Sequence, residues 1–165
     1  MPRSESAATP AIVALTAAGV AFSRHSYEHD ASARGFGLEA VRALGLPPEQ
    51  VFKTLLVDTA VGGTGGLAVG VVPVSGALDL KAMAAALGVK RVSMADPALA
   101  QRVTGYVVGG ISPIGQKRAL STVVDISAEL FEVVYVSGGR RGLDLGLAPA
   151  DLIKVTGAVL ADIGC

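Results

Sequence analysis

Hydrophobic residues occur along this chain in short blocks, separated by helix caps or by glycine and proline. Thr9-Pro10 and Asp96-Pro97 each open a block and Asp79 opens another, and a Gly closes each of them, as is typical of helix ends. Alternating or continuous apolar runs between turn residues indicate strands. The patterns predict helices from Pro10 to Gly19, over 38–44, from Asp79 to Gly88, from Asp96 to Gly105 and from Pro149 onward. They predict strands at 20–27, 51–57, 67–74, 106–108, 121–125, 132–137, through 143–145 and at 158–163.

The order of these elements predicts an α+β protein with a mixed α/β fold. Roughly seven or eight strands and four or five short helices do not alternate strictly, which disfavours a Rossmann layout. We expect one mixed sheet of about seven strands, curved or barrel-like and flanked by short helices. Residues 1–8 are predicted to be a flexible leader, 9–165 a single compact domain, and the GGTGG run at 62–66 the tip of a hairpin.

Composition narrows the class of protein. Half of the residues, 51%, are apolar and 17% are charged, which is typical of a globular domain. The formal net charge of zero disfavours a large phosphate-binding footprint but not contact with the end of an RNA. No apolar stretch is long enough to cross a bilayer, and the first ten residues lack a hydrophobic signal core. With Cys165 as the single cysteine, we expect a cytoplasmic protein without membrane attachment.

Lys53 is the only charge in the apolar run 51–57, VFKTLLV. A charged group within a strand is unfavourable unless it faces solvent or a polar site. Lys53 is therefore either an ordinary outward lysine or a cation at a cleft that holds a phosphate or polarises a carbonyl. In a regular strand its neighbour Thr54 points to the opposite face.

A glycine-rich loop lies within 105–118, GYVVGGISPIGQKR. Gly109 and Gly110 can present backbone N–H groups to an oxyanion, or they can simply form a tight turn. Ser112 follows in the same loop. Lys117 is either a solvated surface lysine or, beside such donors, a group that steers a phosphate.

A second glycine-rich loop lies within 135–149, YVSGGRRGLDLGLAP. Ser137 ends a strand and Asp144 returns on the next one, with Arg140 and Arg141 in the turn between them. One interpretation is a β-hairpin with a basic tip. The other places Ser137 and Asp144 at the rim of a pocket, as hydrogen-bonding partners of a substrate amine or hydroxyl.

Motifs of several other catalytic classes are absent from the sequence. No G-x-S-x-G elbow surrounds Ser137, and no Walker, GxGxxG or HEXXH pattern occurs. His25 and His29 are the only histidines, and no Cys/His/Asp cluster has metal-ligand spacing. Cys165 lacks the surroundings of an activated thiol. A hydrolase with this sequence must take its nucleophile from water or from the substrate.

Three segments together resemble the bacterial Cys-tRNA(Pro) deacylase (YbaK) family, which is akin to the editing domain of prolyl-tRNA synthetases. They are FKTLLV, LDLKAMAAALGVKRVSMADPALAQRVTGYVVGGISPIGQKR and YVSGGRRGLDL, and the start TPAIVALTAAGVAFSRHSYEHD is similar to that family's opening. The resemblance covers about 9–163 in order. It implies a compact mixed α/β fold, no metal or organic cofactor, and a cleft for the aminoacylated 3′ end of tRNA. It places the family's site positions at Tyr27, Phe36, Lys53, Thr54, Gly109, Ser137 and Asp144.

The resemblance and these residues together imply substrate-assisted cleavage of mischarged Cys-tRNA(Pro). The thiol of the bound cysteine would attack its own ester carbonyl, since intramolecular attack reaches effective molarities of about 10⁵ M or more. We assign catalysis, through oxyanion stabilisation, phosphate or ribose contact and orientation of the aminoacyl group, to Lys53, Gly109, Gly110, Ser137 and Asp144. We assign substrate binding to Tyr27, Phe36, Thr54, Ser112, Lys117, Arg140 and Arg141.

Two other functions fit the same residues. A related editing hydrolase would use water on Ala-tRNA(Pro) or another misacylated tRNA. A non-catalytic module would bind an oligonucleotide end or a protein through Lys53 and the basic glycine loops. The family also implies a partner, because a protein with so little basic surface would gain its choice of tRNA from a transient complex with prolyl-tRNA synthetase.

Overall fold

The computed structural model describes residues 8–30, 35–59 and 66–165. Nearly all of the predicted leader and of the GGTGG tip therefore lies outside the described residues. The helices are α1 Pro10–Ala17, α2 Phe36–Leu44, α3 Leu80–Leu87, α4 Pro97–Thr104 and α5 Pro149–Thr156, with a 3₁₀ turn η1 at Ile126–Leu130. The strands are β1 Ser23–Ser26, β2 Phe52–Asp58, β3 Leu67–Pro73, β4 Ser93–Met94, β5 Ser121–Asp125, β6 Val134–Ser137, β7 Leu143–Leu147 and β8 Val159–Ala161.

The strands form two sheets, which confirms the mixed α/β class. A three-stranded antiparallel sheet has the order β1-β7-β6, and a five-stranded mixed sheet has the order β4-β2-β3-β5-β8. In the larger sheet β2 and β3 are antiparallel, whereas β3–β5 and β5–β8 are parallel. Neither sheet closes into a barrel, so two sheets replace the single curved or barrel-like one that the strand order suggested.

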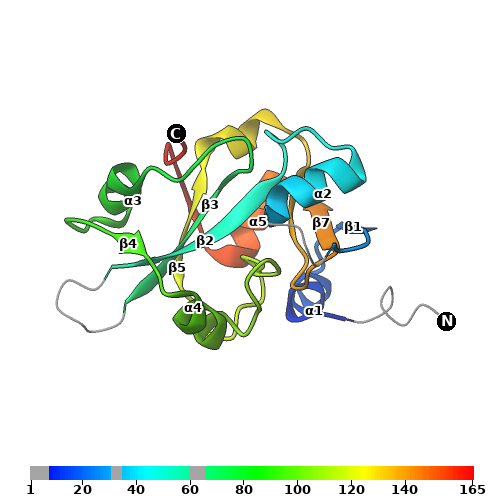
Figure 1. Cartoon of the computed structure of the whole chain (residues 1–165), viewed down its shortest axis with the longest axis horizontal. Helices are drawn as coiled ribbons and strands as arrows, with labels where there is room; N and C mark the ends of the chain where they lie inside the picture. Colours follow the sequence, from blue (N-terminus) through cyan, green and yellow to red (C-terminus); the bar gives the residue numbers. More distant parts are fainter. Residues whose placement is uncertain (1–7, 31–34, 60–65) are drawn as a thin grey trace.

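The five-stranded sheet is buried on both faces, which explains the continuous apolar sequence of β3. Ala68 and Val72 face α3 and pack in a cluster with Met83. The alternate residues Val69 and Val71 belong to the core formed with α1, α5 and the small sheet. Because successive side chains of a strand point to opposite faces, β3 contributes residues to both hydrophobic cores. Figure 1 shows β2 and β3 crossing the molecule, with α3 on one side and with α1, β1 and β7 on the other.

Helix caps account for most of the helix boundaries. The side chains of Thr9, Asp79 and Asp96 each accept a hydrogen bond from the backbone N–H three residues later, as N-caps do. Gly88 and Gly105 end α3 and α4 in the left-handed conformation that glycine adopts without strain. No helix in the described parts of the chain is long enough to span a membrane.

The predicted strand at 106–108 is wrong. These residues form a loop in which Tyr106 is buried and its hydroxyl donates to the carbonyl of Ile114 at 2.7 Å. The backbone N–H of Val108 donates to the side-chain carbonyl of Gln101 at 2.8 Å. Side chains and turn hydrogen bonds, and not a neighbouring strand, pair with this backbone. Of the three apolar residues only Tyr106 is buried, whereas Val107 is 50% exposed. The strand predicted at 20–27 shortens to β1, and β4 and η1 were not predicted.

The carboxylate of Asp125 holds the C-terminal residues against the large sheet. Its Oδ1 accepts hydrogen bonds from the N–H groups of Ile163 at 2.9 Å and Gly164 at 3.0 Å. Its Oδ2 accepts from the N–H and the hydroxyl of Ser127. Burial by itself raises the pKa of Asp125, but these hydrogen bonds outweigh it and the pKa lies below its ordinary value.

We predict that Asp125→Ala lowers the free energy of unfolding by about 3 kcal/mol or more, because each buried N–H that loses its acceptor costs about 1–3 kcal/mol. A lowered carboxyl pKa stabilises the folded state above the unfolded pKa of about 4, and this contribution is lost as the pH falls through the folded-state value. Urea denaturation at neutral and at acidic pH measures both effects. Exposed Asp162 is the matched control, whose replacement by Ala should change stability by less than about 0.5 kcal/mol. Equal stability of the two variants at neutral pH would contradict this role of Asp125.

Candidate active site

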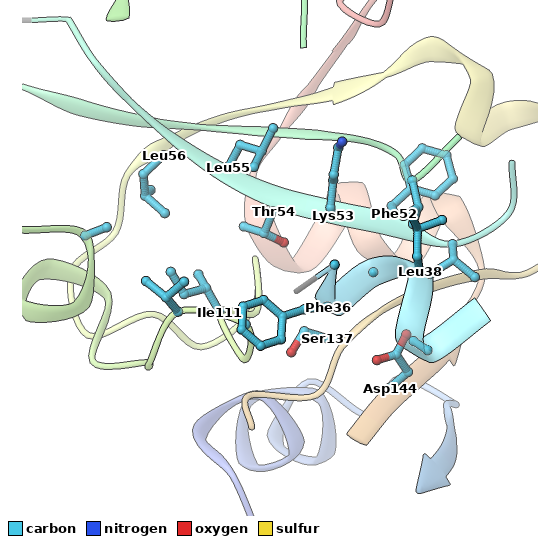
Figure 2. A pocket seen from close by; sticks show the side chains of 18 of the residues that line it. Phe36, Leu38, Phe52, Lys53, Thr54, Leu55, Leu56, Ile111, Ser137 and Asp144 are labelled. Atoms are coloured by element: carbon cyan, nitrogen blue, oxygen red, sulfur yellow. The ribbon is translucent and has the colours of Figure 1, made fainter. Parts of the chain in front are cut away.

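A cavity of about 390 Å³ lies where β2, α2, the loop at 108–111 and the end of the small sheet meet. This size lies within the range of small-molecule sites. Most of its wall is apolar, with Phe36, Leu38, Phe52 and Ile111 among the lining residues (Figure 2). Only two of the lining residues, Lys53 and Asp144, carry groups that are charged at neutral pH in water.

The small sheet supplies Asp144 and Ser137 to this cavity. The sequence LDLGL of β7 alternates, so Leu143, Leu145 and Leu147 enter the core while Asp144 lies on the opposite face. Ser137 of β6 is the cross-strand partner of Asp144. Because the neighbouring N–H of Gly138 bonds to the carbonyl of Leu143, the Ser137–Asp144 pair is of the non-hydrogen-bonded type, in which side chains approach closely. Both side chains line the cavity.

Asp144 is 5% exposed, and its burial raises the pKa of its carboxyl to about 7. A buried carboxylate without a cation beside it is destabilised, so the group holds its proton to near-neutral pH. Tyr27 on β1's side of the same sheet also lines the cavity. Burial, with the nearby carboxyl of Asp144 as a further cause, raises the pKa of Tyr27 to about 12. The Tyr27 hydroxyl is therefore a hydrogen-bond donor throughout the physiological range.

Phe36 forms one wall and explains why position 109 is glycine. Gly109 has φ of +88°, and a Cβ there would lie 2.8 Å from the Phe36 ring. The guanidinium of Arg141 lies 5.0 Å from the centre of the same ring, and its Nε donates to the carbonyl of Val108 at 2.9 Å. Arg141 thus joins the two glycine-rich loops behind Phe36 and does not line the cavity.

Thr54 and Lys53 leave β2 on opposite sides, as predicted for a regular strand (Figure 2). Thr54 projects toward Phe36 and Ser137, and its hydroxyl oxygen is buried without a hydrogen-bond partner among the described residues. Lys53 projects to the other face, where its Nζ donates to the carbonyl of Gly76 at 2.7 Å. Both residues line the cavity, but the ammonium of Lys53 lies apart from the Thr54 hydroxyl.

Five of the predicted positions lie outside the cavity wall: Arg141, described above, and Gly110, Ser112, Lys117 and Arg140. The N–H of Gly110 donates to the carbonyl of Val107 within a turn, and the glycine packs directly on the backbone of Arg140. Ser112 is fully buried, and its hydroxyl accepts from the N–H of Ile114. Lys117 is exposed on the surface. These five positions are thus not brought together with the candidates that do line the cavity, which are Tyr27, Phe36, Lys53, Thr54, Gly109, Ser137 and Asp144.

Apolar lining residues such as Leu38, Met94 and Ile111 escaped the sequence analysis. No local signal separates them from core residues, although Leu38 and Met94 are 45% and 50% exposed. The described residues contain no group of three His, Cys, Asp or Glu side chains that could hold a metal ion. Within its mostly apolar wall, the cavity contains the hydroxyl of Thr54, unpaired among the described residues, together with the titratable carboxyl of Asp144 and the phenol of Tyr27.

The sequence and the structure are similar to those of known proteins. The family described as an aminoacyl-tRNA editing domain matches residues 36–155. A protein of Enterococcus faecalis, assigned as the Cys-tRNA(Pro)/Cys-tRNA(Cys) deacylase EbsC, is 37% identical over 121 residues, which are 73% of this chain and 72% of that protein. A crystal structure described as a trans-editing enzyme for prolyl-tRNA synthetase superposes with a TM-score of 0.77 at 26% identity, covering 97% of this chain and 99% of that one. The crystal structure of a hypothetical protein gives a TM-score of 0.83 at 27% identity, covering 95% and 100%. The chain belongs to the aminoacyl-tRNA editing domain family.

Proposed function

We propose that this protein is a freestanding deacylase that hydrolyses cysteine from mischarged Cys-tRNA(Pro). The observation that carries the proposal is a small, mostly apolar cavity whose described wall offers polar positioning groups but no cysteine or histidine side chain. An enzyme with such a site can use a nucleophile that the substrate brings, and the cysteinyl thiol is the strongest one that an aminoacyl ester carries. The similarity to a protein assigned as a Cys-tRNA(Pro)/Cys-tRNA(Cys) deacylase supports this substrate.

The reaction follows from this arrangement. The cysteinyl sulfur gives up its proton and attacks the ester carbonyl carbon, forming a C–S bond and a tetrahedral oxyanion. The oxyanion collapses, the bond to the ribose oxygen of the terminal adenosine breaks, and that oxygen takes up a proton. Cysteine leaves as a thiolactone, which water opens to free cysteine. Asp144 is suited to exchange these protons, since a carboxyl with a pKa of about 7 can both hold and release a proton at neutral pH.

Lys53 is proposed to bind the acceptor end. Its ammonium is on the face of β2 away from the Thr54 hydroxyl and donates a hydrogen bond to the neutral carbonyl of Gly76. A lysine on a four-carbon stem can exchange such a carbonyl for a phosphate of the terminal nucleotide. In this role Lys53 fixes the tRNA end while Thr54, Ser137 and Tyr27 position the aminoacyl group.

The choice of tRNA is proposed to come from a partner. The chain has 14 basic and 14 acidic residues, which leaves little net attraction for the body of a tRNA. A transient complex with prolyl-tRNA synthetase would supply the charged tRNA(Pro) directly, in the cytoplasm where aminoacylation takes place. Addition of the synthetase should then increase discrimination between tRNA(Pro) and tRNA(Cys).

We predict that Cys-tRNA(Pro) is deacylated at least about 100-fold faster than Ala-tRNA(Pro), because alanine has no group that can replace the intramolecular attack. Release of radiolabelled amino acid from both substrates at equal enzyme concentration measures this ratio. Faster release of alanine would favour an editing hydrolase that uses water. Absence of release from either substrate, with binding retained, would favour a non-catalytic module.

We predict that Lys53→Ala lowers kcat/KM at least about tenfold, chiefly through KM, because one charge-assisted contact to the acceptor end is lost. Stability should change little, since the ammonium makes a single hydrogen bond to the Gly76 carbonyl. The matched control is Lys81→Ala, which removes an exposed lysine of α3. Unchanged KM in Lys53→Ala would show that Lys53 does not contact the substrate.

We predict that Asp144→Asn stabilises the protein at alkaline pH while lowering kcat/KM about 100-fold or more. The folded-state pKa of about 7 lies above the ordinary carboxyl pKa of 3.8, so the folded state binds this proton more tightly than the unfolded state. Wild-type stability therefore falls as the pH rises from about 4 to about 7, by up to about 4 kcal/mol, and stays lower above that range. The side-chain amide of the Asp144→Asn variant does not ionise, so this variant does not lose stability as the pH rises. Urea denaturation near pH 4 and near pH 8 measures the difference, with Asp162→Asn as the exposed control. A variant that is less stable at both pH values would contradict this account of Asp144.

A further inference from the structure

One edge of β2 lacks a strand partner over part of its length. The N–H of Val74 donates to the carbonyl of Val51, so the backbone of Val51 points toward β3. Backbone groups alternate in direction along a strand, so every second residue after Val51 also pairs with β3. The N–H and C=O groups of Thr54 therefore point to the opposite edge. Among the described residues, strand partners on that edge are limited to a bridge from Val51 to Tyr135 at one end and the ladder to β4 at Val57 and Asp58 at the other.

The open stretch of this edge faces the cavity. Every residue at 51–56 lines the cavity, both those on the Thr54 side and those on the Lys53 side, as expected when a cavity abuts a strand along its edge. The β4 ladder ends before this stretch, and only the carbonyl of Leu56 is taken, by the N–H of Ala95 at 3.0 Å. The orphaned hydroxyl of Thr54 lies on the same wall. A backbone N–H, a backbone C=O and a hydroxyl of one residue are thus directed at a cavity whose wall is mostly apolar.

Main-chain N–H and C=O groups in proteins are almost always paired with protein, ligand or water, so a set that faces a cavity without a protein partner is available to a ligand with the complementary groups. Two residues that form a hydrogen-bonded antiparallel pair exchange both of their N–H···O=C bonds. An aminoacyl ester carries an amino group and a carbonyl on one α-carbon, which is the set that such a pair requires. We propose that the aminoacyl group of the substrate pairs with the backbone of Thr54 as a one-residue extension of the sheet, its α-amino group donating to the Thr54 carbonyl and its ester carbonyl accepting from the Thr54 N–H. The proposal rests on the proposed aminoacyl-tRNA substrate.

This pairing fixes where the substrate side chain goes. In an antiparallel hydrogen-bonded pair of L-residues, both side chains lie on the same face of the sheet. The thiol of an L-cysteinyl group then lies beside the Thr54 hydroxyl, on the face that Ser137 also approaches (Figure 2). A D-cysteinyl group would direct its thiol to the other face, where Lys53 and Leu55 project.

The same pairing supplies a donor for the reaction. The Thr54 N–H would contact the carbonyl oxygen that becomes negatively charged during attack, and a fixed donor at that atom lowers the barrier. Gly110 does not offer such a donor, since its N–H is already bonded to the carbonyl of Val107. The strand edge is thus a positioning element for the amino acid and an oxyanion donor at once.

Hydrogen exchange of single amides tests the proposal. The probe is L-cysteine joined through an amide bond to 3′-amino-3′-deoxyadenosine, and amide exchange is followed by NMR with and without it. We expect exchange at Thr54 to slow at least about tenfold when the probe binds, because a main-chain hydrogen bond forms. Exchange at Leu55, whose N–H pairs with β3, should change little. The variant Thr54→Val should keep the slowing, since it removes the hydroxyl and leaves the backbone. Binding of the probe without slowing at Thr54 would overturn the proposal.

Deacylation of tRNA(Pro) charged with D-cysteine gives a second readout. The D-ester keeps the thiol and the amine, so its uncatalysed cyclisation is the reference for the enzymatic rate. We expect at least about tenfold slower enzymatic release than from the L-ester, and equal release would overturn the pairing geometry. Failure of the enzyme on L-Cys-tRNA(Pro) itself would instead contradict the proposed function, so the two failures are distinguishable.

Discussion

The gap in pairing along the edge of β2 is the constraint on which the site depends. Between the bridge at Val51 and the ladder that begins at Val57, this strand directs backbone polar groups into a cavity instead of toward another strand. Such groups are costly to bury unpaired, so the fold tolerates them only where a substrate or water completes them. The same stretch carries the one buried side-chain hydroxyl that has no partner among the described residues, that of Thr54. Strand edge and orphaned hydroxyl together mark the place where a polar ligand belongs.

The architecture around this gap keeps it open. The β2–β3 hairpin is fixed by cores on both faces, so β2 cannot shift to pair elsewhere without breaking them. The small sheet lies on one side and brings Ser137 and Asp144 into the cavity, while Gly109 lets Phe36 close the wall. The buried carboxyl of Asp144 costs stability at neutral and alkaline pH, which is the usual relation between a functional group and the fold that holds it.

Much of the fold follows from local signals in the sequence. The side chains of capping residues such as Thr9 and Asp96 accept hydrogen bonds from N–H groups in the first turn of their helices. Those helix starts can therefore be predicted from the sequence without any tertiary information. The strand predicted at 106–108 was wrong because an apolar run does not by itself show that a strand lies next to it; Tyr106 is buried in a loop and Val107 is exposed. The division into two sheets is also absent from local sequence, since it depends on which distant strands pair.

Part of the site could be predicted from the sequence. The only charge in the apolar run 51–57 drew attention to Lys53 and to its neighbour Thr54. The sequence could not say that Thr54 is the one that projects toward Phe36 and Ser137. Ser112 and Gly110 looked like site residues because serine and glycine serve turns and active sites alike; their hydrogen bonds show turns. The strand edge had no sequence signal at all, because main-chain groups are the same at every position.

The central claim is that the substrate supplies the attacking sulfur while the protein positions it. A single-turnover reaction with excess enzyme and Cys-tRNA(Pro), quenched in acid and analysed by mass spectrometry, identifies the first product released from the tRNA. The account predicts cysteine thiolactone, lighter than cysteine by one water, appearing before free cysteine. Free cysteine formed from the outset, with no thiolactone at any time point, would contradict it.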